Sequence, residues 1–225
     1  MSNLSRIYSM TILLAFFLTT EGSAFAAGVG FPPEDIRLSP DLESSTSLAS
    51  RPTEWAQPAA IEGVPNCFKV TDNLYRGAQP TAEGMRNLQK RGIKTIVNLR
   101  AYHSDRDEIG DLPLDYVHIK IKTWDANENQ IVEFLKVASD PSRQPVFVHC
   151  QHGADRTGTM CAVYRIAVQG WTKDEAIREM TEGGYEFHAI WDNLIELIQN
   201  LDIAKICKNA GLPEPPNTMH KKKTD

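Results

Sequence analysis

The sequence predicts an α/β domain with a central, mostly parallel sheet flanked by helices. Short apolar stretches with strand spacing alternate with amphipathic stretches of helical period through the middle of the chain. The stretch at 145–149 is apolar on both faces, as a central parallel strand is. A loop of small and polar residues follows it and leads directly into another helix. Open sheets of this class bind ligands at the carboxyl ends of their strands, so this loop is the expected binding site.

The first half of the domain begins with two short strands. The expected elements are strands at 67–70 and 73–77, a helix at 81–91 and a buried strand at 94–100. Thr81 suits the N-cap of that helix, because its hydroxyl can accept a hydrogen bond from the first turn, and Gly92 suits its end.

The second half alternates in the same way. The expected elements are a half-buried strand at 114–122, a helix at 127–139, the apolar strand at 145–149, helices from Thr157 and Thr172, and a last helix at about 187–206. The last helix has a wide apolar stripe, which we interpret as core. The stripe consists of Ile190, Trp191, Leu194, Leu197, Ile198 and Leu201.

Length and composition indicate an ordinary globular domain. The chain has 225 residues, of which 41% are hydrophobic and 24% charged, enough for one well-buried core. The formal net charge of -5 argues against broad electrostatic affinity for nucleic acid, so no nucleic-acid partner is expected.

The first 26 residues have the pattern of a secretory signal peptide. One basic residue, Arg6, precedes an apolar stretch at 10–18, and Ala24 and Ala26 form a small-x-small cleavage pattern. The apolar stretch is shorter than the roughly 20 residues that span a bilayer. We therefore expect cleavage after Ala26, no stable membrane insertion afterwards, and a periplasmic or secreted protein.

Composition then sets the remaining boundaries. Residues 27–62 are rich in Pro, Ser, Ala and Glu without a sustained period, which is typical of a disordered linker or arm. Residues 63–208 carry the alternating pattern and form the expected catalytic domain. Residues 209–225 are again rich in breakers and form an expected flexible tail.

The loop after the central strand carries the chemistry. Cys150 stands at the carboxyl end of the strand, and the next residues feed into a helix N-terminus, where amides and the helix dipole attract an anion. Such a setting favours the thiolate, which is a nucleophile. Arg156 adds a two-pronged donor suited to phosphoryl oxygens.

The same residues resemble a known family. "HCQHGADRTG" at 149–158 is similar to the His-Cys-five residues-Arg-Thr-Gly signature of the cysteine-dependent protein tyrosine phosphatases. Length and layout resemble the dual-specificity branch, and most of all its atypical subgroup in bacteria, fungi and plants. The resemblance covers roughly residues 64–203 and includes "NLYRGAQPT" and "VNLR".

The resemblance implies a role for each matching residue. Cys150 would attack phosphorus, His149 would orient the loop and support the thiolate, and Thr157 would ease hydrolysis of the intermediate. The implied phosphate-binding residues are Gln151, His152, Gly153, Ala154, Asp155 and Arg156. The mechanism requires no metal or other cofactor.

A general acid must reach the leaving oxygen from a separate loop or from the signature itself. In the family an aspartate upstream does this work, and Asp125 is the first candidate. Asp155, inside the loop, is the rival, and its alternative role is a pairing partner that makes the loop rigid. Glu128 is a third and weaker candidate.

Other polar residues and cysteines leave alternatives open. Arg76 and Arg100 either line the pocket or form surface contacts or ion pairs. Export would permit a Cys67–Cys207 disulfide, since the ends of compact domains often approach each other; two buried free thiols are the alternative. Four further side chains match no known metal spacing and are read as solvated or locally hydrogen bonded. They are His103, Asp105, Asp107 and His118.

The sequence thus predicts an exported phosphomonoester hydrolase that forms a cysteinyl-phosphate. The expected partner is a phosphorylated protein or a small phosphorylated substrate, with tyrosine or dual-specificity protein phosphatase activity first and inositol phosphates or phosphoinositides second. A loop without lysine weakly disfavours very highly phosphorylated substrates. A rhodanese-like sulfurtransferase and a non-catalytic phosphate-binding module are the alternatives from other classes.

Overall fold

The computed structural model describes residues 51–214. The expected signal peptide at 1–26, most of the expected linker and the end of the expected tail lie outside these residues. Within them, no helix combines the length and the apolarity needed to cross a bilayer.

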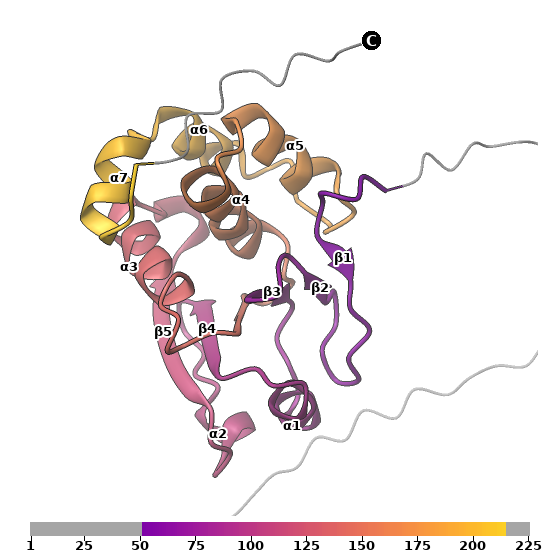
Figure 1. Cartoon of the computed structure of the whole chain (residues 1–225). Coiled ribbons are helices and arrows are strands. Elements are labelled where there is room, and N and C mark those ends of the chain that lie inside the picture. Colours follow the sequence, from indigo (N-terminus) through magenta and orange to yellow (C-terminus); the bar gives the residue numbers. More distant parts are fainter. Residues whose placement is uncertain (1–50, 215–225) are drawn as a thin grey trace, which may run out of the picture. The chain divides into compact units, whose positions relative to one another are not determined.

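A six-stranded sheet forms the centre of the domain, in the strand order β1-β2-β3-β6-β4-β5 (Figure 1). In chain order the strands are β1 (Gln57–Pro58), β2 (Phe68–Lys69), β3 (Leu74–Gly77), β4 (Thr95–Arg100), β5 (Asp115–Ile121) and β6 (Val146–His149). The neighbours from β3 to β5 pair in parallel, whereas β1 and β2 add an antiparallel edge. The predicted α/β class with a mostly parallel sheet is confirmed.

Strand β6 is buried on both faces because a hydrophobic core lies on each side of it. Val146 and Val148 belong to one core, and Phe147 belongs to the other. The strand pairs with β3 on one side and with β4 on the other. Its carboxyl end therefore lies in the middle of the sheet, where the expected binding loop begins.

Helices cover both faces of the sheet. Side chains of α1 (Ala82–Lys90) and α2 (Arg106–Ile109) enter the smaller core. The larger core takes side chains from α3 (Glu128–Ala138), α4 (Asp155–Gln169), α5 (Lys173–Glu182), α6 (Asp192–Asn200) and α7 (Ile203–Ala210). In Figure 1, α4 lies among these other helices, and it has contacts with α3, α5, α6 and α7.

The helix starts follow the side chains that cap them. Thr81 accepts a hydrogen bond from the amide of Gly84, as predicted. Asn127 and Thr172 each form a capping box, in which the cap side chain and the third helical residue satisfy each other's amides. Helix α4 begins at Asp155, two residues earlier than expected.

The single helix predicted at 187–206 is wrong. The backbone of Leu201 is extended, with φ -61° and ψ 133°, and it ends α6. Asp202 then caps α7 by accepting a hydrogen bond from the amide of Lys205. Ile190 is 81% exposed and precedes α6, so it does not join the core. The apolar period was continuous across this break, which is why it concealed the second cap.

The segment 51–62, predicted as part of a disordered linker, packs on the domain instead. The amide of Ala56 donates to Oε1 of the buried Glu179 at 2.6 Å. Arg51 donates to the carbonyl oxygens of Ala56 and Gly183 at 2.7 Å each, and its guanidinium lies 5.1 Å from the ring centroid of Tyr185. These contacts join distant parts of the chain, so local composition gave no sign of them. The domain therefore begins near residue 51.

Candidate active site

Cys150 follows β6 directly and lies at the base of the loop that leads into α4. Its residue surface is 1% exposed, so the thiol lies deep in the loop. The next helix begins at Asp155, which leaves residues 150–154 as the loop. Amides at such a helix N-terminus attract an anion, and the predicted strand, loop and helix are all present.

The loop is held close to the end of β3. Gly153 has φ +73°, and a Cβ atom there would lie 2.5 Å from the carbonyl carbon of Gly77. Arg76 is 2% exposed and donates to the carbonyl oxygen of Gly153 at 2.7 Å. Its guanidinium also lies 3.8 Å from the ring centroid of Tyr185. Arg76 is therefore neither a surface arginine nor part of an ion pair among the described residues. Its guanidinium supports the loop by binding the backbone at Gly153.

A buried carboxylate holds the histidine that precedes the nucleophile. Nε2 of His149 lies 2.7 Å from Oδ2 of Asp105, and both side chains are 0% exposed. Nδ1 of His149 lies 3.2 Å from the carbonyl oxygen of Cys150. The ring can donate to both acceptors only when both nitrogens carry a proton. The expectation that Asp105 is solvated or locally bonded is wrong, because its partner lies 44 residues away.

Further donors hold Asp105 in place. Side-chain amides of Gln79 and Asn98 donate to its Oδ1, each at 2.9 Å. Burial alone would raise the pKa of Asp105, but hydrogen bonding and the charge of His149 outweigh it and hold that pKa below its usual value of 3.8. The side chain is thus a fixed anion under the loop.

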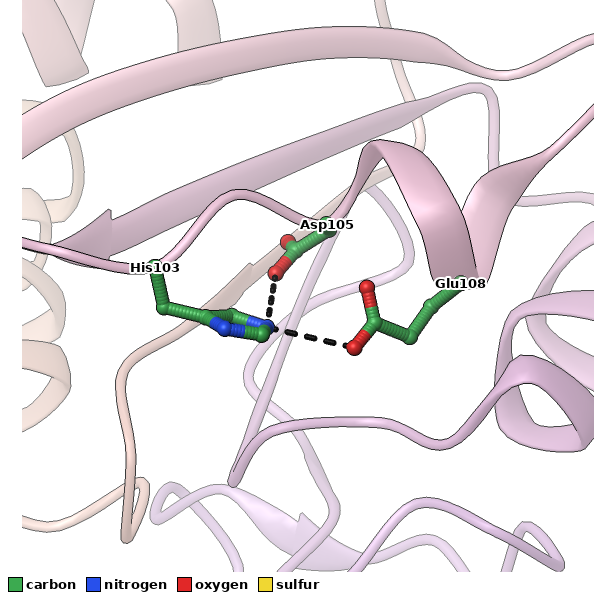
Figure 2. Close-up of side chains that lie close together, drawn as sticks. All are labelled: His103, Asp105 and Glu108. Atoms are coloured by element: carbon green, nitrogen blue, oxygen red, sulfur yellow. Dashed lines mark ion pairs between the residues drawn. The ribbon is translucent and has the colours of Figure 1, made fainter. Parts of the chain in front are cut away.

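The side chains of His103 and Glu108 lie close to Asp105, as Figure 2 shows. Nε2 of His103 lies 3.2 Å from Oε1 of Glu108 and 3.7 Å from Oδ1 of Asp105. Their ligand atoms lie within 4.8 Å of one another. Sequence spacing did not indicate this cluster, which we interpret as ion pairing around Asp105.

Arg156 and Thr157 lie in the first turn of α4 and carry buried side-chain donors. Nη1 of Arg156 contacts the carbonyl oxygens of Leu99 and Ile121, at 3.4 and 3.3 Å. These carbonyls end β4 and β5, so the guanidinium lies at the same sheet edge as Cys150. Among the described residues, Nε of Arg156 and Oγ1 of Thr157 are buried without a hydrogen-bond partner. Both can therefore serve a bound oxyanion.

The two general-acid candidates have different surroundings. The Asp155 carboxylate accepts from the amide of His188 at 2.9 Å, and Nδ1 of His188 lies 3.0 Å from both of its oxygens. Asp155 is thus a pairing partner that ties the loop to the segment before α6. Asp125 ends the short 3-10 helix η1 (Thr123–Asp125) and is exposed.

Helix η1 follows the end of β5, where Arg156 contacts the backbone. It begins two residues after Ile121, whose carbonyl oxygen Arg156 contacts. The side-chain amide of Asn193 donates to the carbonyl oxygen of Thr123 at 2.9 Å and anchors η1. Glu128 lies on α3, and its carboxylate forms an ion pair with Lys205 at 2.6 Å. This pairing argues against Glu128 as the general acid.

A groove of about 990 Å³ runs beside the loop. Gln151 and His152, both exposed, line one side, and residues between 58 and 68 line the other. The Asn66 amide donates to the carbonyl oxygens of His152 and Tyr185, at 2.9 and 3.1 Å, and fixes the two sides. Sequence analysis missed this wall because it assigned much of it to the linker.

The structure also places Arg100 and the two cysteines Cys67 and Cys207, for which the sequence left alternatives open. Arg100 is half-buried and donates to Oε1 of Gln79 at 3.2 Å, next to the Asp105 network. Cys67 and Cys207 are buried free thiols in the two different cores, so the disulfide hypothesis is wrong. Burial raises the pKa of Cys67 to about 11 and also raises that of Cys207.

Comparison with known families agrees with this geometry. A family model described as "DSP-PTPase phosphatase fused to NAD+ Kinase" matches residues 66–192, more than half of the chain. The chain belongs to the DSP-PTPase family. The matched part of this DSP-PTPase runs from the groove wall through the whole loop to the start of α6.

Bacterial relatives resemble this DSP-PTPase along the same region. The dual specificity protein phosphatase TpbA of Pseudomonas aeruginosa is 34% identical over 145 residues, which is 64% of this chain and 65% of the relative. The alignment thus spans just under two thirds of that protein's own length.

Solved structures confirm the fold of the DSP-PTPase. The crystal structure of P. aeruginosa TpbA matches with a TM-score of 0.64 and 28% identity, covering 72% of this chain and 99% of that one. A Cys-to-Ser variant of TpbA in complex with pTyr matches equally well, at 27% identity. The catalytic core of the PP-IP phosphatase SIW14 from S. cerevisiae shares the fold at 21% identity, with a TM-score of 0.57 over 70% of this chain.

Proposed function

We propose that the protein is an exported phosphomonoester hydrolase that acts on phosphotyrosine through a cysteinyl-phosphate intermediate. One observation carries the proposal: Cys150 precedes a loop that ends at the N-terminus of α4, and Nε of Arg156, in the first turn of that helix, is buried without a hydrogen-bond partner among the described residues. A thiolate with adjacent oxyanion donors is the minimum needed for phosphoryl transfer to sulfur.

In the first step, the Cys150 thiolate forms a bond to phosphorus while the bond from phosphorus to the ester oxygen breaks. The guanidinium of Arg156 and the loop amides take up the charge on the equatorial oxygens. Asp125 donates a proton to the leaving oxygen, so that an alcohol or phenol departs.

In the second step, water attacks phosphorus and the bond from sulfur to phosphorus breaks. Asp125, now a carboxylate, accepts a proton from the water, and inorganic phosphate leaves. The Thr157 hydroxyl, which is buried without a partner among the described residues, donates a hydrogen bond to the departing sulfur in this proposal. His149 and Asp105 hold the loop during both steps and do not touch the phosphate.

Asp125 is preferred over Asp155 because of what each carboxylate contacts. The Asp155 carboxylate is already hydrogen bonded to the backbone amide and the ring of His188. Asp125 is exposed and sits on a separate segment at the sheet edge that Arg156 contacts, as a general acid requires.

Phosphotyrosine is the proposed substrate because TpbA, in the variant named above, is recorded in complex with pTyr. Inositol phosphates, the other substrate class predicted from the sequence, serve as the comparison in the assay. Export is proposed from the signal-peptide pattern of the first 26 residues. N-terminal sequencing of the mature protein should begin at Ala27.

The test is a panel assay without added metal. Para-nitrophenyl phosphate, a phosphotyrosine peptide and inositol hexakisphosphate are compared, with the wild-type protein and Cys150→Ser side by side. We expect turnover of the first two, inhibition by vanadate, and loss of turnover in Cys150→Ser. Rapid acid quench should trap phosphate on Cys150, and activity in Cys150→Ser would contradict the mechanism.

A further inference from the structure

The groove beside the catalytic loop includes the two residues that directly follow Cys150 in the chain. Gln151 and His152, which follow Cys150 directly, form one side of it. The opposite wall comes from the N-terminal part of the domain and is mostly apolar. Its apolar side chains include Pro58, Ala59, Ile61, Val64 and Phe68. A substrate with its phosphate on Cys150 reaches this wall if its neighbouring groups extend over Gln151 and His152.

The groove is held open by hydrogen bonds across it. The Asn66 amide joins the loop, at His152, to the backbone at Tyr185. On the loop side, the amide of Gln79 donates to the carbonyl oxygen of Gln151 at 3.2 Å. These contacts do not require a ligand, so the groove is pre-formed, as binding sites usually are.

The charges in the groove are all of one sign. Two carboxylates line it, Glu62 and Glu186, and among its described lining residues none is lysine or arginine. Both side chains are exposed, and neither forms an ion pair with a described residue. An anionic group beside the transferred phosphate would meet repulsion here, whereas a cation would find an unpaired carboxylate.

Glu186 is also held in an unusual backbone conformation. Its φ is +65°, in the left-handed region, and Asn66 with φ +50° is the other non-glycine residue of this kind in the described part of the chain. Both line the groove. A residue other than glycine adopts this conformation at a cost in free energy, and the flanking contacts at Tyr185 and His188 maintain it.

We propose that this groove binds the polypeptide next to the phosphorylated residue, and that Glu62 and Glu186 select substrates with a lysine or arginine beside the phosphotyrosine. The inference rests on the proposed phosphatase function and names its substrate class. Apolar walls accept the peptide backbone and the aliphatic stem of the basic side chain, while the carboxylates meet its charge. Polyphosphorylated small molecules are disfavoured at the same surface.

The experiment compares two phosphotyrosine peptides that differ only in the flanking positions, which are lysine in one and glutamate in the other. The readout is the ratio of their kcat/KM values with the full protein. We expect wild type to favour the lysine peptide by about 5-fold, since one exposed ion pair contributes up to about that factor. Glu62→Gln and Glu186→Gln should each lower the ratio, and the double variant should bring it close to 1.

Glu133→Gln is the matched control. Glu133 is an exposed glutamate on α3 and does not line the groove, so its removal should leave the ratio at the wild-type value. Raising the ionic strength should reduce the wild-type ratio, because exposed charges are screened by salt. Dissociation constants of the two peptides with Cys150→Ser should give the same order of preference without turnover.

The outcomes separate this inference from the proposed function. Equal kcat/KM values for both peptides in wild type, with para-nitrophenyl phosphate still hydrolysed, overturn the inference alone. A preference that survives in the double variant also overturns it, as does faster turnover of inositol hexakisphosphate than of either peptide. Failure to hydrolyse para-nitrophenyl phosphate overturns the proposed function, and this inference with it.

Discussion

Nε2 of His149 lies 2.7 Å from Oδ2 of Asp105, and neither side chain reaches solvent. The pair joins the residue before the nucleophile to a segment 44 positions earlier in the chain. Since His149 also lies 3.2 Å from the carbonyl oxygen of Cys150, the position of the catalytic loop depends on this carboxylate.

Asp105→Asn should therefore lower both stability and activity. Loss of a charged partner for buried donors costs about 1–3 kcal/mol. The folded pKa of Asp105 is below its usual value of 3.8. A carboxyl of this kind contributes stability that is present above its unfolded pKa and lost as the pH falls through its folded pKa. The wild-type advantage in unfolding free energy should be complete near pH 7 and shrink below about pH 3.8.

Urea unfolding of wild type and Asp105→Asn across this pH range measures the difference. A constant difference from pH 7 to pH 2 would contradict the paired carboxylate. Asp107→Asn is a suitable control, because Asp107 is an exposed neighbour on α2.

Arg76→Lys should weaken the support of the loop although it keeps the charge. The guanidinium donates to the carbonyl oxygen of Gly153 and stacks on Tyr185, and a lysine ammonium lacks the planar surface for that stacking. We expect a loss of about 1–3 kcal/mol in unfolding free energy and a lower kcat/KM on para-nitrophenyl phosphate. Arg100→Lys, at a half-buried arginine with one hydrogen bond to Gln79, should have a smaller effect on both measurements.

Asp125→Asn should slow turnover most when the leaving group is poor. Removal of a general acid costs about 100-fold or more, and the loss is smaller when the leaving oxygen needs no proton. Steady-state kcat on phenyl phosphate and on para-nitrophenyl phosphate gives the comparison. Asp155→Asn should affect both substrates alike, through the loop. The assignment is reversed if Asp125→Asn spares phenyl phosphate turnover while Asp155→Asn abolishes it.

Cys150 should be the cysteine that iodoacetamide modifies first at neutral pH. Burial raises the pKa of Cys67 and that of Cys161 to about 11, and it raises the pKa of Cys207. Those three thiols are therefore protonated at neutral pH and react slowly. Peptide mapping by mass spectrometry should find label on Cys150, reduced by added vanadate. Faster labelling of Cys67 than of Cys150 would count against a reactive nucleophile in the loop.

The parts of this protein that depend on local sequence were predictable. The apolar strand β6, the cap at Thr81 and the loop from Cys150 to Arg156 each have a signal within a few residues. The family resemblance was carried by the same loop, so Cys150 and Arg156 could be selected as candidates without tertiary information.

The parts that depend on distant contacts were not predictable. Asp105 looked like one of several polar residues in a loop, because its partner His149 is not near it in sequence. The wall at 58–68 looked like linker, because its order comes from contacts such as that of Ala56 with Glu179. The composition of a segment indicates whether that segment can fold by itself. Here the segment is ordered by contacts with the remainder of the domain.

The groove at the catalytic loop joins two stretches of chain that lie far apart in sequence. One contributes the sulfur and the guanidinium, and the other, before β3, contributes most of the wall. Substitutions confined to the second stretch can thus redirect the enzyme toward different targets while the reaction itself is preserved. Homologous enzymes with the same signature can in this way diverge in what they recognise.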